Sequence, residues 1–479
     1  MRSTIIKNLR LFQRCITVLA LCFTYPALAE SIWYKDGDPL QTGISEFPRI
    51  PTGYIDQVSP CSAIDLSKPL SLADVADASL CNNPQTAEVW ASTRVQAAQL
   101  GIAKSAYLPS LSDNVSVNLG ASYPSSDTRS NPTSNLSNSL VASYLLYDFG
   151  NRSATLENAR QLLLSASATQ SSVVQTVLLN ATVAFYQTQA NMAALDAALE
   201  AERASEQSYR AAEARHKAGV ATPADKLQAQ TAYAQLTLAR ITSEGNLQTA
   251  YGNLANIMGL AANQRLTLAT QKINTPNNIL QDVNALIEQA GSRRPDLIAS
   301  EAQFKAAQAN IDANKAAAKP SISVVASNNL QDGNSLATSN NSTLGVSIAI
   351  PLFSGYAPSY RIRVAEATAD LRAAQRDRLK LQISLDVWTA YQNLRTALQS
   401  VTATDVLVAS AEESYRLTLG RYKAGVGNII DTLNAQSALA TARQQQIQAT
   451  LNANIARATL AQSMGALDHA MIQSLPSNE

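Results

Sequence analysis

The stretch Lys217-Ala218-Gly219-Val220 occurs a second time, 206 positions further on, as Lys423-Ala424-Gly425-Val426. Other short matches keep the same offset: Ser208-Tyr209-Arg210 with Ser414-Tyr415-Arg416, and Met258-Gly259 with Met464-Gly465. A constant offset over so many positions indicates a duplication. Two copies are too few for a solenoid, so each copy is predicted to be one half of a single architecture.

The repeated stretch ends a segment that contains no helix breaker. Residues 151–218 lack both Gly and Pro, and so do residues 359–419. At 1.5 Å per residue, the first segment would be about 100 Å long as one helix. In the second segment, apolar residues spaced by three and four predict one apolar stripe, made of Leu381, Leu385, Trp388, Tyr391, Leu394, Leu398 and Val401. Both segments are therefore predicted to be coiled-coil rods.

A second helix is predicted to follow each rod directly, which makes a tight helical hairpin. Gly219 and Gly425 suit the left-handed position just past a helix end. The next residues suit helix starts, with N-cap and N3 residues at matching places: Thr222 and Asp225 in the first copy, Asn428 and Asp431 in the second. The hairpin turns should lie at one end of the rods.

Upstream of each rod, a helix that ends at a proline (85–108 and 296–319) leads into alternating segments at about 110–148 and 320–353. Period-two alternation predicts two strands per copy, each with one apolar face. Leu344, Val346, Ile348 and Ile350 are predicted to face lipid, and Thr343, Gly345 and Ser347 a lumen. Four such strands suit an outer-membrane barrel in length but cannot close one, because the smallest have about eight. Several chains must pool their strands.

The N-terminus is predicted to be a signal peptide, residues 1–29. Four basic residues precede an apolar run from Cys15 to Phe23, and Ala27-Leu28-Ala29 is a cleavage site. A lipoprotein site at Cys22 is the alternative, disfavoured by bulky Leu21 before it. No other run of 18 apolar residues predicts a membrane-spanning helix. The mature chain keeps Cys61 and Cys81, for which a disulfide is predicted in an oxidising compartment, and two free thiols are the alternative.

Composition excludes several functional classes. Charged residues make up 15% of the chain, the net charge is +1, and only two histidines, His216 and His469, are present. The sequence contains no phosphate-binding, zinc-protease or Cys-x-x-Cys motif. We therefore expect no catalytic residues, no metal site, no cofactor and no nucleic-acid partner.

Taken together, the sequence from about Leu70 to Leu467 resembles the TolC-like outer-membrane factor family. The resemblance implies a mainly α chain with a small β part, forming a homotrimer with a 12-stranded barrel in outer-membrane lipid and a helical tunnel in the periplasm. The partners it implies are a periplasmic adaptor and an inner-membrane ABC or proton-driven transporter. The expected division is 1–29 signal peptide, 30–69 N-terminal extension, 70–265 first repeat, 266–467 second repeat and 468–479 tail.

The resemblance also implies roles for the hairpin turns. The adaptor would dock on the tips, Gly219, Val220, Ala221, Gly425, Val426 and Gly427. Tyr422, Asp225 and Asp431 match gate positions, with a Tyr422–Asp225 hydrogen bond expected in the closed state. Two positions depart from the family pattern, because Gly427 and Asn434 replace an arginine and an aspartate. The simpler alternative is that both aspartates only cap helices.

Three functions are candidates for a chain with this pattern. An exit duct explains both the helices and the strands. A periplasmic coiled-coil adaptor or rod explains the helices alone, and a secreted enzyme lacks catalytic residues. The sequence does not decide the exported substrate. It is either proteins, in type I secretion, or drugs or metals. The Ser-, Asn- and Gln-rich composition slightly favours proteins, because it would give a smooth polar lumen.

Overall fold

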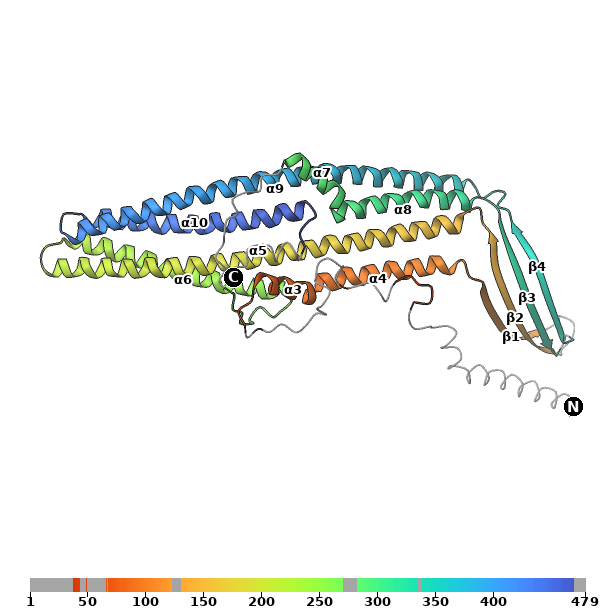
Figure 1. The fold of residues 1–479 in the computed structure, drawn as a ribbon. Helices are drawn as coiled ribbons and strands as arrows, with labels where there is room; N and C mark the ends of the chain where they lie inside the picture. The colour runs from red at the N-terminus through yellow and green to blue at the C-terminus, as the bar shows by residue number, and fades with distance from the viewer. Residues whose placement is uncertain are drawn as a thin grey trace.

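The computed structural model describes residues 38–43, 49, 66, 68–122, 131–269, 282–334 and 337–468. This part of the chain is long and mostly helical, with a small sheet at one end (Figure 1). Its elements run in the order α3 (Leu72–Asn82), α4 (Pro84–Ser105), β1 (Ser110–Ser122), β2 (Asn131–Tyr147), α5 (Asn151–Lys217), α6 (Pro223–Ile257), α7 (Val283–Arg293), α8 (Pro295–Ala317), β3 (Ser321–Gly333), β4 (Ser339–Ala349), α9 (Ala357–Lys423) and α10 (Ile429–Ser463). The mainly α fold with a small β part is confirmed.

The two halves contain matching elements. Helices α5 and α9 each have 67 residues, and α6 and α10 each have 35. Helix α9 is longer than the predicted segment 359–419 because it begins at Ala357, with Pro358 in its first turn, and because Gly420 continues the helix to Lys423. Near the sheet, α4, α5, α8 and α9 lie side by side in that order, which is also the order of the strands that they join (Figure 1). Farther away, α6 pairs with α5 and α10 pairs with α9.

The apolar core lies in the middle of the helical part, in two clusters. One joins α3, α5 and α6 through residues such as Leu80, Leu178 and Met258. The other joins α7, α9 and α10 through residues such as Val387 and Leu460. Helix α5 is long and apolar enough to cross a membrane by length and composition, a property that the sequence did not predict. Its burial against α3 and α6 gives those apolar residues a structural role.

The predicted stripe on α9 is only partly correct. Leu394 and Val401 are buried, but Leu381 is 75% exposed, and Leu385 and Trp388 are also exposed. The row that packs inside the chain is instead Ile383, Val387, Ala390, Leu394, Ala397 and Val401. Two apolar rows therefore run along this helix. Spacing alone does not reveal which of them packs inside the chain.

The Met-Gly pair that closes each half has a packing reason. Gly259 and Gly465 adopt left-handed φ values of 71° and 70°. A Cβ on Gly259 would lie 2.6 Å from the carbonyl oxygen of Asn82, at the α3–α4 turn. A Cβ on Gly465 would lie 3.0 Å from Cα of Arg294, at the α7–α8 turn. In both halves, glycine lets the end of the hairpin approach the backbone of a short-helix turn.

We predict that Gly259→Ala destabilises the chain by roughly 2–4 kcal/mol, because left-handed strain adds to a backbone clash. The midpoint of urea unfolding in detergent measures this. Gly245→Ala is the matched control, since Gly245 lies inside α6 with no atom within 4 Å of an added Cβ. It should be neutral or stabilising by about 0.5–1 kcal/mol. Equal midpoints for the two variants would contradict the packing argument.

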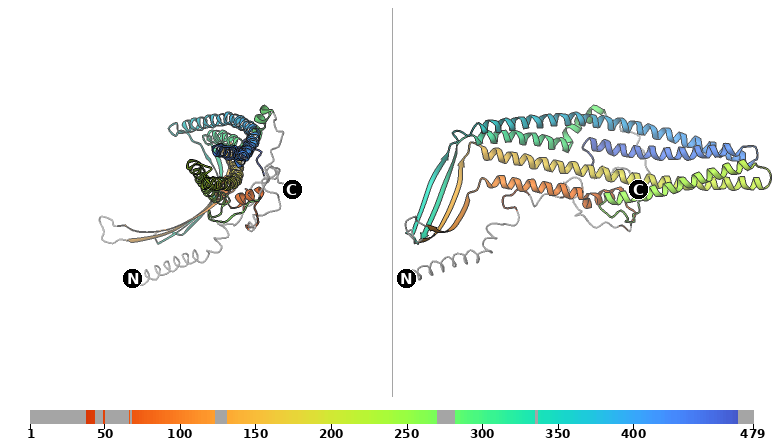
Figure 2. Two further views of the ribbon diagram at one scale, coloured as in Figure 1. Left: turned by 90° about the vertical axis from the view of Figure 1, so that its left-hand side faces the viewer. Right: turned by 180° about the vertical axis from the view of Figure 1, so that it is seen from behind.

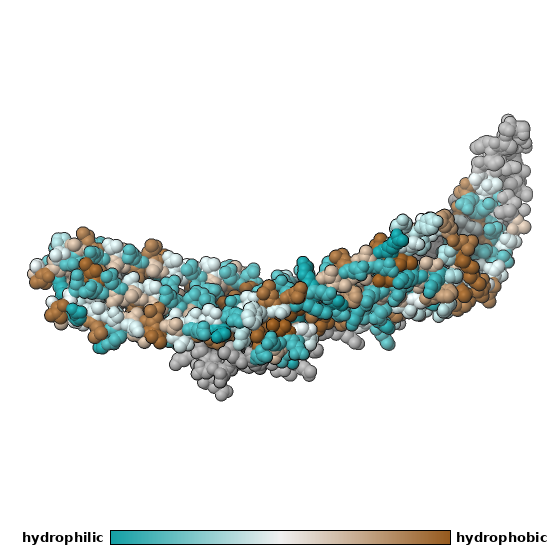
Figure 3. Space-filling view, turned by 90° about the horizontal axis from the view of Figure 1, so that it is seen from above, coloured by the Kyte–Doolittle hydropathy of each residue, from teal (hydrophilic) through white to brown (hydrophobic). Residues whose placement is uncertain are grey.

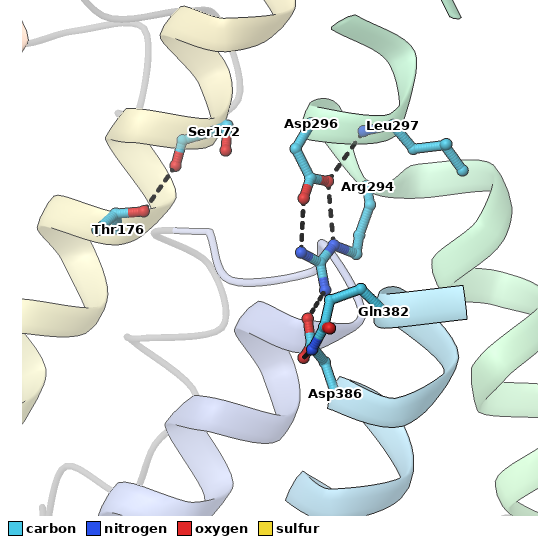
Figure 4. Close-up of polar contacts among 7 residues, drawn as sticks. All are labelled: Ser172, Thr176, Arg294, Asp296, Leu297, Gln382 and Asp386. Carbon is cyan, nitrogen blue, oxygen red and sulfur yellow. Dashed lines mark hydrogen bonds and ion pairs between the residues drawn. The ribbon is translucent and has the colours of Figure 1, made fainter. Parts of the chain in front are cut away.

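An ion-pair cluster holds the α7–α8 turn on α9 (Figure 4). The Arg294 guanidinium donates to both carboxylate oxygens of Asp296 and, at 2.9 Å, to Asp386 on α9. Gln382 also donates to Asp386, at 2.8 Å. Burial works to lower the pKa of Arg294, but the two carboxylates outweigh it and raise that pKa above its usual value. In the first half, the uncharged Asn83 contacts the carbonyl oxygen of Ile257 instead.

Several predictions fall outside the described residues. These are the signal peptide at 1–29, nearly all of the 30–69 extension, and Cys61. Cys81 is buried and disulfide-bonded. Its pairing with Cys61 stays a prediction.

Candidate functional site

The sheet separates apolar from polar side chains in the part nearer the helices, whereas farther out Asp113, Asn328, Asp332 and Ser342 share the face of the apolar residues. It is antiparallel, in the order β1-β2-β3-β4. Residues opposite each other share a face, so the register places Leu344, Val346 and Ile348 beside Ala326, Val324 and Ile322. The other face carries small polar residues, including Ser327, Ser347 and Thr343. We call the two faces the apolar face and the polar face.

The polar face is uncharged in the described strands. Its residues are serine, asparagine, threonine, glutamine, glycine, alanine and valine, with one leucine, Leu145. Neighbouring strands are linked across it by side-chain hydrogen bonds of 2.7 Å, at Ser116–Ser137, Ser139–Asn329 and Ser327–Thr343. Such a surface is wettable and exerts no net attraction on either sign of charge.

The apolar face and both sheet edges lack partners within the described chain. No described helix covers either face, and the sheet projects from the helical part as a single layer (Figure 2). Strands β1 and β4 each pair on one side only. An open edge and an exposed apolar face are both unstable in water, so the sheet needs more strands and an apolar surrounding.

At the opposite end of the molecule, the two hairpin turns lie side by side (Figure 1). Gly219 and Gly425 adopt φ values of 76° and 78°, which confirms the predicted left-handed helix ends. The amide N–H of Val220 donates to Arg215 and that of Val426 to Arg421, closing the same turn in both copies.

The tip residues differ in how much of each side chain is exposed to solvent. Val220 is 74% exposed and Val426 is 71% exposed. Ala221 is half-buried, and Gly427 packs so closely that an added Cβ would lie 2.9 Å from the Tyr422 amide nitrogen. The arginine of the family pattern would therefore not fit at position 427 in this turn.

The predicted hydrogen bond between Tyr422 and Asp225 is absent from the described chain. The Asp225 carboxylate accepts from the backbone N–H of Thr222 at 3.0 Å and from its hydroxyl at 2.9 Å. Asp225 is therefore occupied in a capping box at the start of α6. Tyr422 is 6% exposed, and its hydroxyl has no partner among the described residues.

Tyr422 instead contacts an arginine that the sequence reasoning missed. The Arg215 guanidinium lies over the Tyr422 ring, 4.3 Å from its centroid. It also donates to the Tyr422 carbonyl oxygen at 2.8 Å. This contact, which we call the Arg215 clamp, joins the last turn of α5 to the last turn of α9. Arg421, the equivalent of Arg215 in the second copy, is exposed.

The other charged side chains at the tips interact within their own hairpin or with solvent. The Glu213 carboxylate pairs with Lys226 at 3.2 Å and with Lys217 at 3.7 Å. The hydrogen bond from Lys226, helped by the charge of Lys217, lowers the pKa of Glu213. Asp431 lies at the N3 position of α10 and is exposed, with no ion pair or side-chain hydrogen bond within the described residues. Its carboxylate is therefore available to solvent.

The architecture matches a known family. A family model described as outer membrane efflux protein matches residues 75–260 and 286–466. The chain belongs to the outer membrane efflux protein family. It is an outer-membrane channel protein and not an enzyme, and its long helices extend into the periplasm.

The chain is similar in sequence to outer-membrane proteins that carry different names. Protein CyaE of Bordetella pertussis is 28% identical over 414 residues, covering 86% of this chain and 87% of its own. Outer membrane protein TolC of Escherichia coli is 23% identical over 425 residues, covering 84% of both chains. The toluene efflux pump outer membrane protein TtgC of Pseudomonas putida is 27% identical over 346 residues, covering 68% of both.

Solved structures of outer-membrane channels have the same fold. OprN superposes with a TM-score of 0.74 at 19% identity, covering 88% of this chain and 98% of its own. The MtrE channel of Neisseria gonorrhoeae gives 0.70 at 20% identity, covering 83% and 90%. This level of identity supports the fold of the efflux family and leaves the transported substrate undefined.

Proposed function

We propose that three copies of the chain form an exit duct through the outer membrane. The observation that carries this proposal is the four-stranded sheet with one apolar face, one uncharged polar face and two open edges. Pairing β4 of one copy with β1 of the next would give a 12-stranded barrel, and would turn the apolar face to lipid and the polar face to the lumen.

The helices support a continuous tunnel beyond the barrel. Because α4, α5, α8 and α9 follow the strand order, three copies would place 12 helices around the same axis as the barrel. The exposed apolar row of α9, Leu381, Leu385 and Trp388, is then available to pack against the next copy. This would explain why the sequence carries two apolar rows on one helix.

The proposed duct has no energy source of its own, so its tips would dock on a periplasmic adaptor linked to an inner-membrane ABC or proton-driven transporter. The docking residues would be those of the two turns, Gly219, Val220, Ala221, Gly425, Val426 and Gly427. The Arg215 clamp would hold the tips closed, with Tyr422 as its partner. Asp431 would line the constriction, and Asp225 would keep the start of α6 in place.

For the substrate, we propose proteins exported by type I secretion. The uncharged, hydroxyl- and amide-lined polar face supports this choice, because a polypeptide of varied charge would meet no strong electrostatic trap there. Small molecules are the second candidate, since relatives include proteins named for toluene efflux. Export of a secreted protein, and resistance to toxic compounds, can both be measured in cells with and without the gene.

The duct itself is tested by reconstitution. The mature protein, purified from outer membranes in detergent, should have the mass of a trimer and should form ion-conducting channels in planar lipid bilayers. Release from membranes by high salt without detergent would instead favour the periplasmic rod.

Cysteine scanning tests which face of the sheet meets the lumen. A water-soluble thiol reagent should label cysteines at Thr343, Gly345 and Ser347, and should spare those at Leu344, Val346 and Ile348, because lipid shields the apolar face. Arginine at Val346 should cost roughly 2–4 kcal/mol, and arginine at Gly345 much less. Equal labelling of the two sets would refute the assignment of the faces.

A further inference from the structure

Strand β4 runs into α9 through a segment with unusually exposed apolar side chains. Leu352 is 91% exposed, and Phe353, Tyr356 and Tyr360 are also well exposed. Arg361 and Arg363 follow directly and are exposed too. We call these six residues the junction patch. Hydrophobic residues gather where the helices meet the sheet (Figure 3).

The patch carries a net positive charge. Residues 339–365 contain no Asp or Glu. Within the described residues, neither Arg361 nor Arg363 has an ion-pair partner, and the Arg363 guanidinium lies 5.5 Å from the centroid of the Tyr360 ring. The next acid, Glu366, already pairs with Lys315 at 3.7 Å. The two cations of this segment therefore lack a counter-charge in the part of the chain that the structure describes, and Arg363 lies beside an aromatic ring.

The matching junction in the first half has its own counter-charge. There Asp148 lies 3.2 Å from Arg152, whose guanidinium also covers the Tyr107 ring at 4.9 Å. At the offset of 206, Asp148 corresponds to Ser354. At the same offset, Arg152 corresponds to Pro358, so the arginines of the two junctions are not equivalent. The first junction pairs its arginine within the chain, whereas the second carries Arg361 and Arg363 with no ion-pair partner among the described residues.

Both turns also keep an aromatic residue in a strained conformation. Phe149 and Tyr356 have φ values of 54° and 63°, in the left-handed region where a bulky residue is disfavoured. Glycine would adopt either conformation without strain. Each ring has an edge-to-face partner within the chain, Tyr147 for Phe149 and Phe353 for Tyr356. Tyr356 nevertheless stays 68% exposed, and aromatic rings are stabilised at the boundary between lipid tails and headgroups.

We propose that the junction patch binds anionic phospholipid in the periplasmic leaflet of the outer membrane. The aromatic rings would lie at headgroup level, and Arg363, on the same side of α9 as Tyr356 and Tyr360, would pair with a lipid phosphate. Arg361 is two positions away on the helix and would add to the positive charge near the lipid from a neighbouring side. The apolar face of β4 leads directly into the patch through Ile348 and Ile350, so the same lipid layer meets both. This inference rests on the proposed insertion of the sheet in the membrane.

The test measures lipid retention by the whole trimer. Wild type and the double variant Arg361→Gln/Arg363→Gln are purified in neutral detergent with equal amounts of phosphatidylethanolamine and phosphatidylglycerol, and bound lipids are counted by native mass spectrometry. Wild type should retain phosphatidylglycerol preferentially. The double variant should lose that preference by about fivefold or more, since each cation near an anionic surface contributes about that factor.

Arg395→Gln is the matched control, because it removes the same charge from an exposed site on α9, about 50 Å farther along the helix. It should retain lipid like wild type. Tyr356→Gly relieves the strained backbone and should also lower phosphatidylglycerol retention. No preference in wild type, or an unchanged preference in the double variant, would overturn the proposal.

Two further results separate this proposal from the one it rests on. If the double variant fails to form trimers, Tyr356→Gly alone tests the patch. Unchanged phosphatidylglycerol retention by Tyr356→Gly would then overturn lipid binding in favour of a contact between copies. Channel conductance in phosphatidylcholine bilayers, which contain no anionic lipid, tests the duct independently. Channels without lipid preference would refute only the lipid site, whereas absence of channels from all proteins would refute the duct.

Discussion

Replacing both Val220 and Val426 with aspartate should abolish export while leaving trimer assembly intact. These two side chains are the exposed apolar residues of the hairpin turns, at 74% and 71% exposure. They contribute little to folding of the chain, so their loss should affect partner binding alone. Burying an aspartate in an apolar docking contact costs about 2 kcal/mol or more per site, and a trimer would present six such sites.

The matched control is Val220→Thr together with Val426→Thr, which keeps the shape of both side chains and adds no charge. Export by the threonine variant should be reduced only partly. Gly425 is a less suitable position to test, because its φ of 78° makes any substitution strain the turn. Detergent-extracted trimer, quantified beside exported protein, separates docking from assembly. Normal export by the aspartate variant would exclude the tips as the docking site.

The features that the sequence predicted correctly are local ones. Gly219, Gly425, Thr222 and Asp225 act within one turn of a helix, where capping rules apply without knowledge of the rest of the chain. The strand faces follow from alternation, which register then preserves across the sheet. The repeat offset made both kinds of prediction stronger, because each pattern occurred twice.

The features that the sequence did not reveal depend on which surfaces meet. Leu381 and Ile383 lie two positions apart on α9, and spacing cannot decide which of their rows faces inward. Likewise, Arg215 and Arg421 are equivalent in sequence, yet within the described part of the chain Arg215 reaches the other hairpin and Arg421 does not. One difference between the two copies in the sequence does indicate this asymmetry. The residue after Arg215 is His216, whereas the residue after Arg421 is Tyr422, so only the second tip offers a tyrosine ring to a cation.

This asymmetry changes the expected closing contact. The resembled family implied that Tyr422 would bond to Asp225, but that carboxylate is already bonded to Thr222. Arg215 instead contacts both the ring and the carbonyl oxygen of Tyr422. The arginine that the family pattern places at position 427 is replaced here by one from the other hairpin. We propose that the contact has the same closing role, with a different helix supplying the charge.

Arg215→Gln should therefore raise single-channel conductance in planar bilayers by freeing the second hairpin from the first. A partly desolvated cation–π contact and a charged hydrogen bond together are worth roughly 2 kcal/mol or more. Loss of that energy would shift the open-to-closed ratio by about thirtyfold. Arg210→Gln is the control, because Arg210 lies on the same helix and, among the described residues, pairs with Glu206 alone, one turn away. It should conduct like wild type.

Two substitutions at Tyr422 decide which contact closes the tip. Tyr422→Phe keeps the ring under Arg215 and removes a hydroxyl that has no partner within the described residues, so conductance should stay close to wild type. Tyr422→Ala removes the ring and should match Arg215→Gln. If Tyr422→Phe alone opens the channel, the hydroxyl bonds to a neighbouring copy and the Asp225 hypothesis is restored. Asp431→Asn should weaken cation preference without changing the open-to-closed ratio, because its exposed carboxylate can act on ions but holds no hairpin in place.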